Sequence, residues 1–323
     1  MKFWVWTSID RSATDEALIA KYSALRSNGI TGIFLADGID DREFEIIRAQ
    51  GLELHSWMIT TNCREPEIRD AHPDWYMVSR SGKSSLTDPP YVHYYRWLSP
   101  ALPEVRDHIT QRAKKLAAHP LIQGVHLDYV RYPDVILPIG LWEQYGLDQS
   151  EELPDFDFDY SERVREIAQQ QIGRDPLEIT DPAHHQDWLH FRYQSVTTLV
   201  DQITQAVHDC NKQITAAVFP TPSMARKICR QDWDKWSLDL CCPMIYHSFY
   251  HEPVDWIGKC MLENIAATPV PICAGLYMPA FKSPAEFAQG LQIVKERGGA
   301  GVSLFDAVGE DYWQVFREFV SSV

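Results

Sequence analysis

Short runs of apolar residues alternate with longer amphipathic stretches along the whole chain. The runs are rich in Val, Ile, Leu and Ala and are nearly continuous, as expected of strands that are covered on both faces. Each run is followed by a stretch with helical periodicity or by a long connection. Eight runs are predicted as strands, over residues 3–7, 32–36, 52–59, 122–128, 214–219, 238–246, 271–278 and 301–305.

Helices are predicted between these strands because apolar residues recur on one stripe. Residues 104–118 show this with Val105, Ile109 and Ala113, and Asn28-Gly29 is a typical helix end. No linker or composition break divides the chain. The pattern therefore predicts an α/β fold, a single (β/α)8 TIM barrel spanning residues 1–323 as one domain. The predicted helices cover residues 14–27, 42–49, 104–118, 188–210, 224–236, 256–266, 284–297 and 311–320.

Two long loops interrupt the alternation, after the third and fourth predicted strands. The first, residues 60–103, is rich in aromatic residues, and the second, residues 129–181, contains a short predicted helix at 162–171. The second also carries an acidic run, residues 155–159, which we interpret as a solvated loop because no calcium-loop spacing supports a metal site. Loops that follow barrel strands lie on the carboxyl face, so we expect the functional site there.

The fourth predicted strand ends in the densest cluster of functional side chains. A carboxylate at the carboxyl end of a barrel strand, among aromatic and basic groups, is how barrel enzymes present a catalytic acid. We therefore predict that Asp128 is a catalytic acid; the alternative is that it caps the next turn or pairs with a neighbouring Arg. The cluster consists of His126, Asp128, Tyr129, Arg131 and Tyr132.

Other predicted strand ends supply side chains of the kind that bind sugars. Aromatic rings stack on the apolar faces of sugar rings, and carboxylates, His and Arg bind the hydroxyl edges. Any single Trp is also a good core residue. The candidate substrate-binding residues are Trp6, His55, Trp57, His126, Tyr129, Arg131, Tyr132, Tyr246, His247 and Tyr277.

Glycoside hydrolysis needs a carboxylic acid to protonate the leaving oxygen and usually a second carboxylate. Asp306, after the eighth predicted strand, and Asp37, after the second, are the candidates. Asp306 also fits a turn or cap before Gly309, and Asp37 a turn before Gly38. No carboxylate ends the seventh strand, which argues against a retaining pair on strands four and seven. An inverting route, or one in which a substrate acetamido group is the nucleophile, is left open.

Composition excludes several other classes. The net charge of −15 argues against nucleic acid and anionic membranes as partners. The seven Cys residues form no CxxC pair, and no cofactor motif is present. His55, His126 and His247 leave a metal-dependent hydrolase as a weaker alternative, although His at a strand end more often holds a hydrogen bond.

The sequence also bears on location. No apolar window is long enough to span a bilayer, and residues 1–6 lead directly into a strand without the features of a signal peptide. The expectation is therefore a cytoplasmic protein without a membrane partner.

Several motifs together resemble a known family. The chain is similar to the glycosyl-hydrolase-like group related to family ten, whose members include the poly-N-acetylglucosamine-hydrolysing domain of a bacterial biofilm export protein. The resemblance implies a barrel that acts on a carbohydrate, with Asp128 catalytic or substrate-binding and with His55, Trp57, His126, Arg131 and Tyr132 lining the cleft. The motifs are residues 51–57, 72–75, 97–100, 103–106 and 124–133, with Trp188, Phe191 and Arg192.

The chain departs from this family at two positions. Members often have Asp in place of Gln123, and many have a second Asp where Tyr129 stands. We predict a glycoside hydrolase that cleaves an oligo- or polysaccharide with Asp128 as general acid. The missing second Asp keeps a non-catalytic carbohydrate-binding barrel as the alternative.

Overall fold

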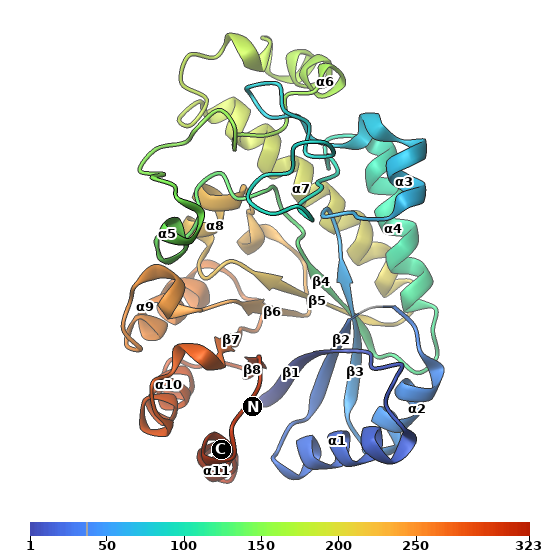
Figure 1. Ribbon diagram of the computed structural model, residues 1–323, viewed down its shortest axis with the longest axis vertical. Coiled ribbons are helices and arrows are strands. Elements are labelled where there is room, and N and C mark those ends of the chain that lie inside the picture. Colours follow the sequence, from blue (N-terminus) through green and yellow to red (C-terminus); the bar gives the residue numbers. More distant parts are fainter. Residues whose placement is uncertain (37) are drawn as a thin grey trace.

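The computed structural model describes residues 1–36 and 38–323 of the chain. Eight parallel strands lie at the centre, and helices surround them (Figure 1). Hydrogen bonds give the order β6-β5-β4-β3-β2-β1-β8-β7, and isolated bridges join β6 to β7 and close the barrel. The predicted (β/α)8 barrel is confirmed. The strands are β1 (Lys2–Ser8), β2 (Gly32–Ala36), β3 (Glu53–Ile59), β4 (Gly124–Asp128), β5 (Gln213–Val218), β6 (Leu240–Pro243), β7 (Cys273–Tyr277) and β8 (Gly301–Phe305).

The helices begin at residues with clear capping roles. The side chains of Thr14, Asp40 and Ser283 each accept a hydrogen bond from a backbone N–H of the first helical turn. Among the described residues, no helix has the length and apolar character needed to cross a membrane. The helices are α1 (Asp15–Ser27), α2 (Asp41–Ala49), α3 (Pro66–Ala71), α4 (Pro103–Ala117), α5 (Trp142–Tyr145), α6 (Glu162–Ile172), α7 (Gln186–His208), α8 (Pro222–Cys229), α9 (Trp256–Ala267), α10 (Pro284–Glu296) and α11 (Glu310–Val320).

Two predicted elements are shorter than expected, both near the cavity described below. The helix predicted at 224–236 ends at Cys229 because Arg230 adopts a left-handed backbone, with φ 56°, and its buried guanidinium pairs with Glu152. The strand predicted at 238–246 covers only Leu240–Pro243, because the N–H groups of Tyr246 and His247 bond to carbonyls two residues earlier and turn the chain away from the sheet. The next residues form the short 3₁₀ helix η5 (His247–Tyr250).

The barrel interior is packed with aromatic rings. Trp4 stacks on Phe34 with ring centroids 4.4 Å apart, and Phe34 stacks on His126 at 3.7 Å. Gly124 leaves room for this packing, because a Cβ there would lie 2.6 Å from the ring of His55 and 2.7 Å from a backbone carbonyl of β5. The filled interior makes the barrel a core rather than a pore.

The two long loops cover the carboxyl side of the barrel, together with α3, α5 and α6 (Figure 1). The prediction of a solvated acidic loop at 155–159 is wrong for its central residues. Asp157 is buried and pairs with Arg192 of α7 at 2.5 Å, and buried Asp159 accepts a hydrogen bond from Ser99 at 2.5 Å. Asp155 is the one of these three carboxylates that is only partly buried, and it pairs with Lys83 at 2.7 Å. The burial follows because α7 brings a cation beneath the loop.

Candidate active site

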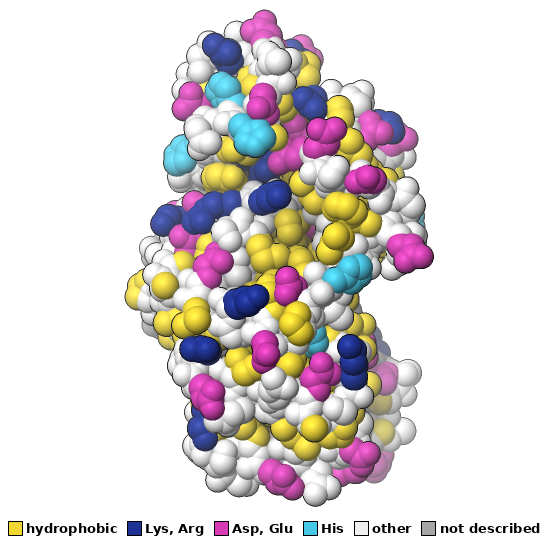
Figure 2. All heavy atoms as spheres, turned by 90° about the vertical axis from the view of Figure 1, so that its left-hand side faces the viewer, with side chains coloured by type: hydrophobic (Ala, Val, Ile, Leu, Met, Phe, Trp, Pro, Cys, Tyr) yellow, Lys and Arg dark blue, Asp and Glu magenta, His cyan; other side chains and the backbone are white. Residues whose placement is uncertain are grey.

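A cavity of about 310 Å³ lies at the carboxyl ends of the strands, below the two long loops. The face shown in Figure 2 is hollowed at mid-height, where hydrophobic side chains gather. The walls of the cavity are formed by the ends of β1, β3, β4, β5 and β8, by the segment after β6, and by both loops. The predicted site residues that the structure brings together here are Trp6, Trp57, Asp128, Tyr129, Arg131 and Tyr246.

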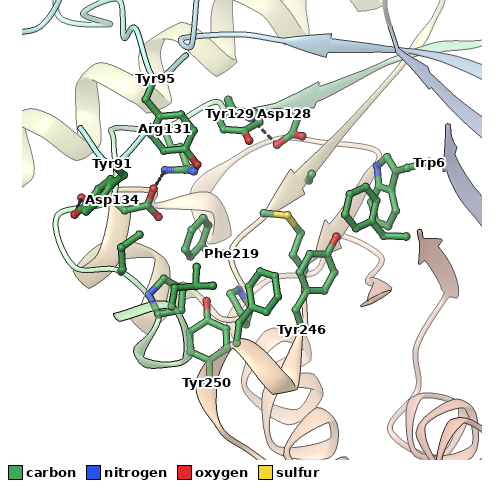
Figure 3. Close-up of a pocket in the computed structure, with 18 of the residues that line it drawn as sticks. Trp6, Tyr91, Tyr95, Asp128, Tyr129, Arg131, Asp134, Phe219, Tyr246 and Tyr250 are labelled. Carbon is green, nitrogen blue, oxygen red and sulfur yellow. Dashed lines mark hydrogen bonds and ion pairs between the residues drawn. The ribbon is translucent and has the colours of Figure 1, made fainter. Parts of the chain in front are cut away.

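Asp128 is the last residue of β4 and is only 8% exposed. One carboxylate oxygen accepts the backbone N–H of Tyr129 at 2.7 Å, and the other accepts the indole N–H of Trp57 at 3.1 Å (Figure 3). Burial raises the pKa of Asp128 against the opposing effects of these hydrogen bonds and of Arg131. A carboxyl group whose pKa is raised by burial is better suited to donate a proton.

Tyr129 gives the end of β4 its shape. Its backbone has φ 52°, an uncommon conformation for a residue with a side chain, and this turn brings its N–H back to the Asp128 carboxylate. Thr61 fixes the same turn from the other side, because its hydroxyl donates to the carbonyl of Arg131 at 2.7 Å. The geometry of Asp128 is therefore set by the loop as well as by the strand.

A second carboxylate, Asp134, lines the same cavity and is 3% exposed. Its Oδ2 accepts a hydrogen bond from Arg131 Nη1 at 3.0 Å, and Arg131 also donates to the Tyr132 carbonyl at 2.9 Å. Asp134 was not among the site residues predicted from the sequence, although its spacing of three residues from Arg131 is visible there. The guanidinium also lies 4.9, 5.2 and 4.9 Å from the ring centroids of Trp97, Tyr129 and Phe219, respectively.

His55 and His126 are placed differently from the expectation. Both are fully buried inside the barrel, below the cavity, and neither is among the residues that line it. The reason is strand alternation, which points both side chains toward the barrel axis at levels below Asp128. Burial lowers the pKa of both rings, that of His126 well below its usual value. The resemblance placed both on the cleft wall, and this geometry corrects that placement.

The two rings belong to a hydrogen-bonded chain along the barrel axis. Trp6 donates its indole N–H to Nε2 of His126 at 2.9 Å, and Nδ1 of His126 lies 2.8 Å from the Thr215 hydroxyl. That hydroxyl lies 3.3 Å from Nδ1 of His55, whose Nε2 lies 3.2 Å from Glu53. Lys2 completes the chain by pairing with Glu53 at 3.1 Å.

The two ends of this chain fix the position of every proton. Trp6 can only donate, so Nε2 of His126 accepts and Nδ1 carries the proton. The Thr215 hydroxyl then accepts from His126 and donates to His55, whose Nε2–H donates to the Glu53 carboxylate. The role of His126 is therefore to hold Trp6, a residue of the cavity wall, in position.

Three further candidates lie behind the cavity wall. Tyr132 is fully buried, and its hydroxyl lies 3.4 Å from Asp159. His247 is buried in η5 against Phe281, with ring centroids 5.1 Å apart. Tyr277 packs on Tyr246, with ring centroids 5.4 Å apart. These residues support the wall rather than forming its surface.

One predicted second carboxylate, Asp306, is not brought to this cavity. Asp306 is exposed after β8, has φ 79°, and accepts the Ala307 N–H at 2.6 Å. It lines a separate cavity together with Lys21 and Trp313. The turn-former interpretation therefore describes its local geometry. Asp37, the other candidate, lies outside the described residues.

The cavity wall also holds aromatic residues that were not predicted as site residues. Tyr91 and Tyr95 come from the first long loop, whose aromatic content was the available cue. Phe219 follows β5, and Phe249 and Tyr250 belong to η5. Nothing in the sequence near η5 distinguishes these two rings from core residues.

The His residues considered as metal ligands do not converge. His247 lies against Phe281, whereas His55 and His126 have their ring nitrogens engaged within the barrel. Within residues 1–36 and 38–323, no three His, Cys, Asp or Glu side chains are grouped so as to hold a metal ion.

Comparison with solved structures finds glycosidase barrels. The fold is similar to the PgaB (BpsB) glycoside hydrolase domain from Bordetella bronchiseptica, with a TM-score of 0.70, 11% identity and coverage of 99% of both chains. It is also similar to the catalytic domain of β-amylase from Paenibacillus polymyxa, with a TM-score of 0.65, 13% identity and coverage of 99% of this chain and 98% of that one. At these identities the likeness shows the fold.

Sequence comparison identifies the family. No curated protein matches the chain at a significant level. The profile of the family described as Glycosyl hydrolase-like 10, however, matches residues 21–290, which is well over half of the chain. The family resemblance expected from the motifs is therefore confirmed: this protein belongs to the Glycosyl hydrolase-like 10 family.

Proposed function

We propose that this protein is a glycoside hydrolase in which Asp128 is the general acid. The observation that carries the proposal is the position of Asp128, a buried carboxyl group at the end of β4 that faces an aromatic-lined cavity. Burial raises its pKa, and protonation of the leaving oxygen requires this raised value. Membership of a glycosyl-hydrolase-like family supports the same reaction class.

Trp57 and the Tyr129 amide act on the acid itself. Each donates a hydrogen bond to one oxygen of Asp128, which fixes the plane of the carboxyl group. After the proton has moved to the leaving group, these same N–H groups stabilise the carboxylate that remains. Trp6 and Tyr246, which line the same cavity, supply rings on which a sugar can stack.

Asp134 is our candidate for the second carboxylate. Of the described residues that line the cavity, it is the other one with an acidic side chain. A second carboxylate commonly accepts a proton from the attacking water. Asp134, which lines the cavity beside Arg131, would take this role once the leaving group has left its side of the sugar.

The test is a screen of aryl glycosides and oligosaccharides, including N-acetylated ones, with wild type and variants in parallel. We expect Asp128→Asn to lower turnover by roughly 10²–10⁴-fold, the usual contribution of general acid catalysis. Asp155→Asn, at a partly buried carboxylate outside the cavity, is the matched control and should retain wild-type turnover. Wild-type turnover in Asp128→Asn would refute the proposal.

Two further variants identify the second carboxylate. Asp134→Asn should lower turnover, and Asp306→Asn should not, because Asp306 is exposed and lines a different cavity. Loss of turnover in Asp306→Asn, with wild-type turnover in Asp134→Asn, would instead identify Asp306 as the second carboxylate, as the sequence suggested.

One observation favours a second candidate, a non-catalytic carbohydrate-binding barrel. Asp134 is ion-paired with Arg131, so Asp128 is the cavity carboxylate without a direct ion pair among the described residues. This candidate predicts that sugars bind, as measured by calorimetry, while no product forms after long incubation. Asp128→Asn would then change affinity only.

A further inference from the structure

The cavity has two ends of different chemistry. Asp128 belongs with Trp6, Trp57 and Tyr246 at one end, which we call the strand-end half. At the other end, which we call the loop half, the wall is formed by Tyr91, Leu137, Leu141, Tyr145, Phe249 and Tyr250 beside the Arg131–Asp134 pair. Figure 3 shows Trp6 and Tyr246 on one side, Tyr91 and Asp134 on the other, and Phe219 between them.

The loop half offers few hydrogen-bonding groups to a ligand. The Tyr91 hydroxyl already donates to the Asp134 carbonyl at 2.7 Å and accepts from Gln149 at 2.9 Å. Arg131 and Asp134 bond to each other, and aromatic rings cover the guanidinium. Apart from this pair and Asp128, the described residues lining the cavity are all apolar or aromatic. Phenol hydroxyls, such as those of Tyr145 and Tyr250, are the other polar groups.

Two loops meet over this half. The 3₁₀ helix η2 (Ile139–Leu141) of the second long loop packs against η5. The contact is close, because a Cβ on Gly140 would lie 2.7 Å from the Phe249 carbonyl oxygen. The loop half is therefore bounded where these loops touch, and a long polysaccharide cannot extend through that contact.

The loop half would bind a sugar ring and an apolar group with different affinities. A sugar carries several hydroxyls, and each one that is buried without a partner weakens binding. An apolar or aromatic group instead gains from contact with Leu137, Leu141 and the surrounding rings. The wall therefore favours the second kind of group.

We propose that the loop half binds an apolar, aromatic leaving group, so that the substrate is a sugar linked to a phenol-type aglycone. This inference rests on the proposed hydrolase function. Hydrolysis would break the bond between the anomeric carbon and the phenol oxygen. Asp128 would supply the proton to that oxygen, and water would supply its hydroxyl to the carbon and its remaining proton to Asp134. The products are the free sugar and the phenol.

The test begins with binding of 4-methylumbelliferone, a fluorescent phenol, to the full chain, and it needs no turnover. Leu141→Asn should weaken binding about tenfold, because it places an amide in the apolar wall. Leu177→Asn is the matched control, since Leu177 is 46% exposed and does not line the cavity, and it should bind as wild type. Wild-type affinity in Leu141→Asn, or no binding to wild type, would overturn the inference.

Tyr145→Phe tests whether the loop half binds a second sugar instead of an apolar group. The substitution removes one hydroxyl and leaves the ring in place. If the loop half takes an apolar group, wild type prefers aryl glycosides to disaccharides of the same sugar, and Tyr145→Phe keeps this order of preference. If the half recognises a second sugar, the variant should lose about tenfold or more in kcat/KM on disaccharides of the same sugar. A disaccharide preferred over the aryl glycoside, with this loss, overturns the inference.

The two proposals fail in different ways. If wild type binds 4-methylumbelliferone, Leu141→Asn weakens that binding and no glycoside is hydrolysed, the apolar character of the loop half is supported and the hydrolase function is refuted. If hydrolysis depends on Asp128 but is faster on disaccharides and is unchanged by Leu141→Asn, the hydrolase function is supported and the apolar leaving group is refuted.

Discussion

Replacing Asp159 by Asn should change how the stability of the protein depends on pH. Asp159 is fully buried in the loop that covers the barrel, and burial raises its pKa from 3.8 to about 7. Hydrogen bonds from Ser99 and Tyr132 to one oxygen offset this only in part. The other oxygen has no hydrogen-bond partner among the described residues, so the ionised form is poorly satisfied.

The sign follows from proton binding. Between pH 3.8 and about 7 the folded protein keeps a proton on Asp159 that the unfolded chain has released, so folding stability falls as pH rises through this interval. The full difference of roughly 3 pKa units corresponds to about 4 kcal/mol. Between pH 5 and pH 8 the accessible part is roughly 2 units, or about 3 kcal/mol. Below pH 4 the contribution to stability is fully present.

The measurement is urea unfolding of wild type and Asp159→Asn at pH 5 and pH 8. At pH 5 the two should be close, because a protonated carboxyl group resembles the amide. The free energy of unfolding of the variant minus that of wild type should be about 3 kcal/mol larger at pH 8 than at pH 5. Asp155→Asn, at the partly buried first residue of the same acidic run, is the control and should show no such gain. Parallel pH profiles for wild type and Asp159→Asn would refute the reasoning.

Three further predictions follow from the site and the barrel interior. Nitrogen NMR should find His126 as the Nδ1–H tautomer from pH 6 to pH 8, because Trp6 donates to its Nε2; an Nε2–H signal would contradict the chain. Gly124→Ala should lower the free energy of unfolding by about 1–3 kcal/mol or more in urea titrations, since its Cβ would meet His55 at 2.6 Å; wild-type stability would contradict the packing. Hydrolase activity should fall as pH rises through the raised pKa of Asp128, and a pH–rate profile without this basic limb would argue against its role as acid.

The barrel was predictable because its signals are local. Buried parallel strands must be apolar along their length, and helices on the outside must carry an apolar stripe, so each element shows itself within a few residues. Asp128 was predictable for a related reason, since the carboxyl end of a barrel strand is a position that the order of elements alone defines. Two predicted elements were too long. The helix ends at Arg230, which pairs with the distant Glu152, and the strand ends where tight turns follow Pro243.

The roles of individual side chains were less predictable, because they depend on partners far away in the chain. His126 looks like a ligand in the sequence, but strand alternation turns it into the barrel, where it meets Trp6, 120 residues earlier. Asp159 looks like part of a solvated acidic run, but Ser99 and the cover of α7 make it a buried group. Hydrophobic pattern reports burial on average and does not report which partner a polar group meets.

By itself, then, the sequence determined the alternation of strands and helices, the two long loops at the carboxyl face and the position of Asp128 at the end of β4, because periodicity and order fix these features. Only the tertiary structure decided which residues form the cavity. It placed Asp134 and the rings of η5 in the wall, moved His55 and His126 behind it, and separated Asp306 from Asp128. The physical reason is that a cavity is formed by side chains from many elements, and their convergence is fixed by packing rather than by any local pattern.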